Sequence, residues 1–345
     1  MRTLVALAIL PLPLIAQDFR SQEKITVERI IIDARVTQAN GEPVLNLTPA
    51  DFLVKIDGVP ATIESLEWIP ETAVGREVAG IDRPQPEASA SLDVPAPRGR
   101  LLVFFFQTDF GREKVRIGGQ MKVLSYADQL IESLDPDDRV AVLSYDSHLK
   151  FRLDFSDNKS RISEAIRSAL LTDEPNRPQA VPMPSLASHL KPDELRATST
   201  VEKGFIVLAN ALRPIPGPKS LILFGWGLGR YGATGVRMTH EYPAAKRALE
   251  SARVSVFSMD FTEADAHTLA VGLSKVADDT GGFYETTFRF PQLAIDRLQK
   301  TLTGHYELEV RKPPTKVSGV HLIDVEIPKN RNLMVMARSS YVDRE

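Results

Sequence analysis

The feature that most constrains this chain is the alternation of apolar, strand-like runs with helix-like segments between residues 100 and 303. Residues 101–106 are continuously apolar, which is the pattern of a strand buried on both faces of a parallel sheet. Runs at 140–145, 221–224 and 254–259 have the same character. This repeat predicts an α/β domain with a doubly wound, mostly parallel sheet of the Rossmann-like class.

One hairpin interrupts the alternation. After the run at 140–145, Leu149, Phe151 and Leu153 follow with a period of two, which predicts an antiparallel partner strand. A Pro-rich loop is expected at 172–193 and a short strand at 283–285. Helices are expected at 117–134, 162–170, 205–212, 241–252, 267–278 and 291–303.

Both ends of the chain have the two-residue period of β-strands. The N-terminal module, residues 22–69, carries strand-like runs at 27–36, 52–56 and 61–66, with turn signals at Asn40-Gly41 and Asp57-Gly58. The tail, residues 304–343, carries further runs at 306–310, 321–327 and 333–338. Three strands alone are marginal, so we expect the two ends to pair into one small β-sandwich-like module.

Two segments are predicted to lie outside the folded domains. Residues 1–16 combine Arg2 with an apolar run and a small residue, Ala16, which is typical of a signal peptide. The run is too short to span a bilayer, so the protein is predicted to be secreted or periplasmic, with no membrane span. Residues 70–99 contain five prolines among small and charged residues and are predicted to be a linker.

Composition excludes several classes of function. The 345 residues are 43% hydrophobic and 25% charged, as in an ordinary globular protein. There are 0 cysteines, which excludes disulfides, thiolate metal sites and a cysteine nucleophile. The formal net charge of -3, with both signs mixed, argues against a nucleic-acid partner. The oligomeric state is left open.

The order of elements in 100–303 resembles the von Willebrand factor type A fold. The segments that carry this resemblance are 137–145, 153–157 and 277–284, the last of which contains Thr-Gly-Gly. The N-terminal segments around 36–44 and 51–60, together with the tail, resemble the secreted type A-related proteins of Acidobacteria. The resemblance implies a domain that binds a protein or peptide partner.

The resemblance also implies where a metal would bind. Type A domains usually hold Mg²⁺ at the carboxyl edge of the sheet through Asp-x-Ser-x-Ser, a Thr on a second loop and an Asp on a third. Magnesium prefers anionic oxygen ligands, and one carboxylate beside an amide would hold it weakly at most. The metal site is therefore predicted to be degenerate, with no cofactor beyond weak Mg²⁺. Its positions would be Gln107, Asp109, Gly111, Thr198, Thr200 and Gly225.

Candidate ligand-binding residues lie at the same edge: Gln107, Thr108, Asp109 and Trp226. Asp109 is expected to cap the following helix or to face solvent. Trp226, on a glycine-flanked loop, either is exposed as a binding anchor or packs over the edge where the metal would be. The sequence leaves both possibilities open.

A dinucleotide site is one alternative, because Gly227, Gly229 and Gly232 form a G-x-G-x-x-G pattern directly after a strand. The helix-breaking Gly235 follows closely, and Asp260 lies too far along the chain to be the expected acidic residue. The pattern is predicted to be a mobile loop instead.

A catalytic function is not predicted, since the six histidines are scattered and neither H-E-x-x-H nor G-x-S-x-G occurs. The acidic pairs at 137–138 and 278–279 are expected to be solvated. One alternative is a hydrolase or other enzyme that uses the cleft at the carboxyl edge, which three convergent titratable side chains lining a pocket would favour. Another is a structural component of an envelope assembly, with the edge capped by Trp226 and the loop at 172–193.

Overall fold

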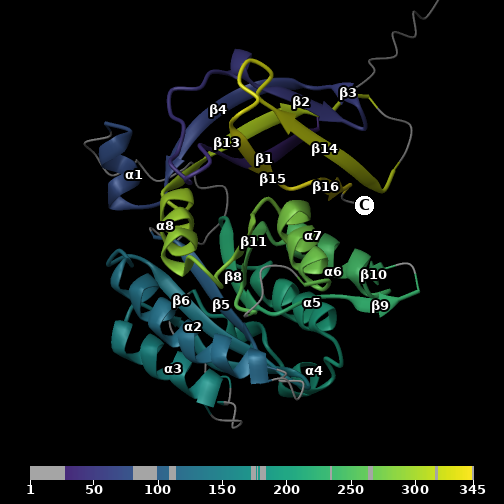
Figure 1. Cartoon of the computed structure of the whole chain (residues 1–345). Helices are drawn as coiled ribbons and strands as arrows, with labels where there is room; N and C mark the ends of the chain where they lie inside the picture. The colour runs from purple at the N-terminus through teal and green to yellow at the C-terminus, as the bar shows by residue number, and fades with distance from the viewer. Residues whose placement is uncertain are drawn as a thin grey trace, which may run out of the picture.

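A computed structural model describes residues 28–80, 99–108, 114–171, 176, 178, 184–233, 235–262, 267–314 and 318–343, with only the backbone described for 114–122. Its centre is a six-stranded sheet in the order β12-β11-β8-β5-β6-β7 (Figure 1). The strands are β5 (Leu101–Gln107), β6 (Arg139–Tyr145), β7 (Leu149–Ser156), β8 (Lys219–Gly225), β11 (Val254–Asp260) and β12 (Tyr284–Thr286). Only β7 is antiparallel to its neighbour. The predicted mostly parallel α/β sheet with one hairpin is confirmed.

Helices cover both faces of this sheet. One face packs against α4 (Pro192–Arg196), α5 (Val201–Leu212), α6 (Tyr242–Ser251) and α7 (Ala270–Thr280). The other packs against α2 (Lys114–Glu132), α3 (Lys159–Leu171) and α8 (Pro291–Thr301). Among the described residues, no helix is long and apolar enough to cross a membrane.

Large apolar side chains fill the space between sheet and helices. On the α2 face, the rings of Phe106 and Phe224 stack with their centroids 4.7 Å apart. On the α5 face, Phe105 packs on Phe205 at 5.4 Å. Since alternate residues of one strand serve opposite faces, the apolar run of β5 is required by both layers.

The two ends of the described chain form two further sheets, each of four strands. The first has the order β15-β1-β13-β4 and the second β16-β14-β2-β3. The N-terminal strands are β1 (Arg29–Thr37), β2 (Leu53–Ile56), β3 (Val59–Pro60) and β4 (Thr62–Pro70), with a short 3₁₀ turn, η1 (Pro49–Asp51), before β2. The tail strands are β13 (Gly304–Arg311), β14 (Val320–Glu326), β15 (Met334–Ala337) and β16 (Ser340–Val342). N-terminal and tail strands therefore pair in both sheets, and their buried side chains share one apolar cluster.

These two sheets lie at one end of the α/β domain (Figure 1). Arg253, which directly precedes β11, donates to Asp33 on β1 and to Glu307 on β13. Arg338 donates to the carbonyl oxygens of Ile31 and Glu250, the latter on α6. The end sheets therefore contact the α/β domain at the amino end of β11 and not at the carboxyl ends of β5 and β8.

Several expected boundaries differ in the structure. Part of the expected linker has regular structure instead, since Pro70 ends β4 and residues 73–78 form helix α1 (Ala73–Val78). Thr72 caps this helix by accepting a hydrogen bond from the Gly75 amide. The remainder of the expected linker, 81–98, and the expected signal peptide, 1–16, lie outside the described residues.

Two expected loops also contain regular structure. The glycine-rich stretch after β8 forms a hairpin of β9 (Arg230–Gly232) and β10 (Gly235–Arg237), where a loop was expected. In the expected Pro-rich loop, residues 187–189 form the 3₁₀ turn η2 (Ala187–His189), and Pro192 begins α4. Both are short elements with little periodicity, so the sequence pattern gave no signal for them.

The Thr-Gly-Gly segment is explained by close packing at the end of α7. Gly281 ends the helix at φ 80°, and a Cβ there would lie 2.8 Å from a backbone atom of Ala337. A Cβ on Gly282 would collide with the carbonyl oxygen of Val256. The Thr280 hydroxyl accepts from the Val256 amide at 3.0 Å. This segment thereby holds α7 against both β11 and β15.

Candidate functional site at the carboxyl edge of the sheet

The sheet changes its winding direction between β5 and β8. Strands β6 and β7 lie on one side of β5, and β8, β11 and β12 lie on the other. In open α/β sheets, ligands usually bind at such a switch point, outside the carboxyl ends of the strands. The residues at these two ends, Gln107 and Gly225, are therefore the first candidates for a site.

Gln107 links the two strand ends through its side chain. Its amide nitrogen donates to the carbonyl oxygen of Gly227 at 3.0 Å, and its amide oxygen accepts from the backbone N–H of Trp226 at 3.1 Å. The side chain is only 2% exposed. Both ends of the amide are thus engaged by the loop after β8. A carboxylate could accept the Trp226 hydrogen bond but could not donate to Gly227.

Gly225 leaves room for this link. A Cβ at residue 225 would lie 3.1 Å from the Gln107 amide oxygen and 3.1 Å from a methyl carbon of Leu273. A larger residue would press on both neighbours, which is a physical reason for glycine at the position where a metal site would place an aspartate.

The threonines assigned to the second metal loop are used within the fold. The Thr198 hydroxyl accepts from the Leu149 amide and donates to the Leu195 carbonyl oxygen, both at 2.7 Å, and the residue is buried. Thr200 caps α5 by accepting from the Lys203 amide at 3.2 Å. Neither threonine contacts Gln107 through a described hydrogen bond. We expected both threonines at the metal site on the carboxyl edge of the sheet. In the structure, Thr198 joins β7 to α4, and Thr200 caps α5.

The two remaining ligand candidates within the described residues, Thr108 and Trp226, lie at the rim. Thr108 hydrogen bonds to the Tyr145 carbonyl oxygen through its amide and its hydroxyl. Trp226 is half-buried and packs against the apolar cluster beneath α2, α3 and α8. Its indole therefore covers part of the edge and presents a limited surface.

The described side chains at the ends of β5 and β8 offer no carboxylate to a magnesium ion. Where type A domains place two aspartates, this chain has an amide that already bridges two backbone groups and a glycine without a side chain. Magnesium requires anionic oxygen ligands and gives up its hydration shell reluctantly. Asp109 and Gly111, the other expected positions, lie outside the described residues.

Sequence reasoning missed a polar cluster at the same edge. Asp260 ends β11, is 1% exposed, and accepts hydrogen bonds from His267 at 2.6 Å, Tyr284 at 2.8 Å and the Thr262 amide at 2.9 Å. Burial and the neighbouring Asp260 charge raise the pKa of Tyr284 above its ordinary value. The position of Asp260 in the sequence could have indicated this cluster. Asp260 comes at the end of an apolar run, and the strand formed by that run lies between β8 and β12 in the sheet.

This cluster does not line a cavity that the described structure has beside α8. That cavity, of about 570 Å³, is lined by residues of α8 and its lead-in, including Phe290, Leu293 and Arg297, and by Asn40 and Glu285. Asp260, His267 and Tyr284 are not among its lining residues. The three titratable groups converge on one another, and their hydrogen bonds join the end of β11 to β12 and to His267, which precedes α7.

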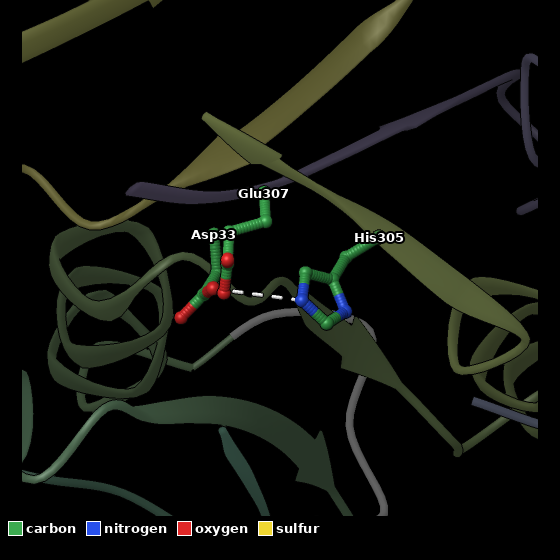
Figure 2. Close-up of side chains that lie close together, drawn as sticks. All are labelled: Asp33, His305 and Glu307. Carbon is green, nitrogen blue, oxygen red and sulfur yellow. Dashed lines mark ion pairs between the residues drawn. The ribbon is translucent and has the colours of Figure 1, made fainter. Parts of the chain in front are cut away.

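A second polar cluster, Asp33, His305 and Glu307, has potential ligand atoms within 4.8 Å of one another (Figure 2). The Arg253 guanidinium is the cation that pairs with the two carboxylates of this cluster. Arg253 lies 2.5 Å from Asp33 and 2.8 Å from Glu307. His305 further contacts Asp33 at 3.5 Å and Glu71 at 2.7 Å.

The ion pairs of this cluster also shift the pKa values of its members. Burial opposes the charged form of His305, but hydrogen bonds to Asp33 and Glu71 raise its pKa to about 9. Burial raises the pKa of Asp33, and hydrogen bonds from His305 and Arg253 outweigh it and hold that pKa well below its usual range. The cluster is an ion network that fastens the end sheets to the α/β domain.

One acidic pair expected at the surface is partly buried. Asp138 is 1% exposed and pairs with the Arg100 guanidinium at 2.5 Å. It also accepts from the amides of Arg100 and Asp135. The expectation of a solvated pair is wrong for Asp138, because this carboxylate organises the turn before β6.

The chain is similar in fold to several solved structures. One is a von Willebrand factor type A protein from Catenulispora acidiphila, with 9% identity over 92% of this chain and 75% of that chain and a TM-score of 0.43. Another is the vWF domain of the type V pili tip protein Mfa5 from Porphyromonas gingivalis, with 12% identity over 58% of this chain and 94% of that chain and a TM-score of 0.37.

A third is proximal thread matrix protein 1 from the mussel byssus, solved with a zinc-occupied MIDAS motif. It shares 13% identity over 61% of this chain and 48% of that chain, with a TM-score of 0.41, so this chain spans about half its length. No protein-family model matches the chain, and no curated protein matches it. The mostly parallel sheet with an antiparallel edge strand is the arrangement that the sequence pattern predicted. The grouping with Acidobacterial proteins stays a prediction.

Proposed function

We propose that this protein is a secreted, non-catalytic binding protein that contacts a protein or peptide partner through the loops at the carboxyl edge of its central sheet. The observation that carries the proposal is the Gln107 side chain, which joins β5 to the loop after β8 at the switch point. A fixed loop costs less entropy to order on binding than a free one. The edge is thereby suited to binding without a metal.

The same observation supports a degenerate metal site as part of the proposal. The bridging amide takes the place that a metal would occupy between the two strand ends, and Gly225 supplies no ligand. Thr108 and Trp226 at the rim are the proposed contact residues. The three convergent titratable groups, Asp260, His267 and Tyr284, hydrogen bond within their own cluster, which favours binding over catalysis.

In this proposal, the two ends of the chain have a structural role and the loops of the α/β domain bind the partner. The two end sheets, 28–69 and 304–343, form a β-sandwich-like module that holds one end of the α/β domain, 100–303, through Arg253 and Arg338. The partner-binding loops lie at the carboxyl ends of β5 and β8, outside that contact.

Panning a random peptide display library against the immobilised mature protein, in buffer with a chelator, tests the proposal. We expect enriched peptides that bind without divalent cations and lose at least about tenfold in affinity in Trp226→Ala, as for a buried aromatic anchor. Trp226→Phe controls for loss of packing, and Phe290→Ala, a change to an exposed aromatic at the separate cavity, should have no effect. Failure to enrich peptides, or binding abolished only by Phe290→Ala, would contradict the proposal.

A further inference from the structure

A cavity of about 570 Å³ lies where α8 meets the turn after β1. Residues of α8 and of the segment leading into it form most of its lining, and Ala39 and Asn40 line it from the turn. The turn is pressed against the helix, because a Cβ on Gly41 would lie 2.5 Å from the carbonyl oxygen of Arg297. Small-molecule sites favour such junctions between domains and have volumes of about 300–1,000 Å³. The size and the place of this cavity are therefore those of a ligand site.

The end of the cavity at the start of α8 is apolar. Phe290 directly precedes the helix and Leu293 lies in its first turn. Both side chains line the cavity, and they are 67% and 65% exposed. Single exposed apolar residues need no explanation, but neighbouring ones at a hollow mark interaction sites. An apolar ligand at this end would remove both side chains from water, which favours binding.

Two cations line the cavity further along α8. Arg297 and Lys300 follow Leu293 by about one and two helical turns. Because a helix rises about 1.5 Å per residue, Lys300 lies about 10 Å along the axis from the apolar end. Lys300 pairs with Glu42 at 3.0 Å, and both side chains are nearly half exposed, so this ion pair contributes little. The carboxylate of a ligand can therefore replace that of Glu42 at small cost.

Arg297 also has hydrogen-bond donors to spare. It donates to Glu285 at 2.5 Å and to the Met334 sulfur, a weak acceptor, at 3.0 Å. Its Nε has no hydrogen-bond partner among the described residues. The acid Asp296 lines the cavity too, but its Oδ1 accepts from Gln292, one turn nearer the apolar end. The far end of the cavity therefore favours an anionic group.

We propose that this cavity binds a small amphipathic carboxylic acid, with its apolar part against Phe290 and Leu293 and its carboxylate held by Arg297 and Lys300. Guanidinium and ammonium groups hold carboxylates through charge-assisted hydrogen bonds, which are the strong ones. A neutral ligand of the same shape would forgo these bonds, and an amine would face the two cations with like charge. This site lies apart from the contact residues proposed at Trp226, so the inference goes beyond the proposed function.

Fluorescence titration of the mature protein with anilinonaphthalene sulfonate, which combines aromatic rings with an anionic group, tests the inference. We expect its emission to rise on binding and to fall again when octanoate displaces it. Octanol and octylamine at equal concentrations should displace it much less. Lys300→Gln should weaken octanoate binding about tenfold, as for the loss of one charge-assisted hydrogen bond. Leu293→Asn should weaken it at least about fivefold through the lost apolar contact.

The matched controls are Lys191→Gln and Leu171→Asn, which should bind octanoate as the wild type does. Lys191 forms an exposed ion pair with Glu194 at 2.8 Å, and Leu171 is 61% exposed at the end of α3. Circular dichroism shows whether each variant is folded.

Three results would overturn the inference: no binding of octanoate by the wild type, equal displacement by octylamine, or equal weakening in the controls. The outcome is separable from the proposed function. Phe290→Ala should weaken octanoate binding and leave the binding of peptides that depend on Trp226 unchanged, so either proposal can fail while the other stands.

Discussion

At the residue scale, the position of Gln107 could be predicted from the sequence and its role could not. The pattern placed an amide where a type A domain has an aspartate, which indicated a lost metal ligand. That the amide bridges Trp226 and Gly227 depends on the backbone of a loop more than a hundred residues away. Asp260 was missed for the same reason, since His267 and Tyr284 reach it only in the folded sheet.

The Gln107 link makes a specific prediction for stability. Gln107→Ala leaves a buried N–H and a buried carbonyl oxygen without partners and should lower the free energy of unfolding by about 2–4 kcal/mol. Gln107→Glu can accept from Trp226 but faces the Gly227 carbonyl oxygen with a negative charge, so it should also destabilise at neutral pH and recover in acid. Urea unfolding at two pH values measures both. Equal stability of Gln107→Ala and wild type would contradict the link.

At the element scale, periodicity predicted the long elements and failed for the short ones. The apolar runs of β5, β6, β8 and β11 and the amphipathic faces of α3 and α5 were anticipated because burial on a defined face fixes their pattern. Helix α1 and strands β9, β10 and β16 have three to six residues each, too few for a period to show. Their form is set by contacts with distant elements, as Ser340 on β16 shows by donating to Glu250 on α6.

Gly58 and Gly281 have similar positive φ angles but different surroundings. Comparing their replacement by alanine therefore distinguishes the energetic cost of the backbone conformation from the cost of a packing clash. Gly58 has φ 79° and open space around it, with no atom within 4 Å of where a Cβ would lie, whereas Gly281 has φ 80° with Ala337 backbone at 2.8 Å. Gly58→Ala should cost about 1 kcal/mol from the left-handed conformation alone. Gly281→Ala should cost about 3 kcal/mol or more, because the end of α7 must move away from β15. Equal costs in chemical denaturation would show that the α7–β15 contact is loose.

At the scale of the whole molecule, buried charges join the end sheets to the α/β domain. Arg35 and Glu71 pair at 2.8 Å beside His305, and Arg253 bridges Asp33 and Glu307. On the α6 side, Glu250 is 3% exposed and accepts from both the amide and the hydroxyl of Ser340. Breaking one partner of such a pair is costly because it leaves the other charge buried.

These groups predict how stability depends on pH. Burial raises the pKa of Glu250 to about 7, above its usual value, so its contribution is fully present below about pH 4.5 and is lost as pH rises through 7. The loss is on the order of 3 kcal/mol. The pKa of His305 is raised to about 9, so its contribution is present in full below about pH 6.5 and is lost as pH rises through 9.

Urea unfolding of wild type and Glu250→Gln across this range checks the assignment. The glutamine can still accept from Ser340 and has no proton to lose, so the decline between about pH 5 and 7.5 should flatten in the variant. The decline near pH 9 should remain, since it belongs to His305. An unchanged profile between pH 5 and 7.5 would assign that decline to another group.

The central claim, that the switch point holds its loops with an amide instead of a metal, is tested most directly by calorimetric titration with Mg²⁺ and Mn²⁺. Wild type and Asp109→Ala should give no binding heat and no rise in melting temperature at about 10 mM cation, whereas a site with a Kd of about 10 μM would add about 4 kcal/mol of stability. Micromolar binding to wild type that Asp109→Ala abolishes would contradict the account.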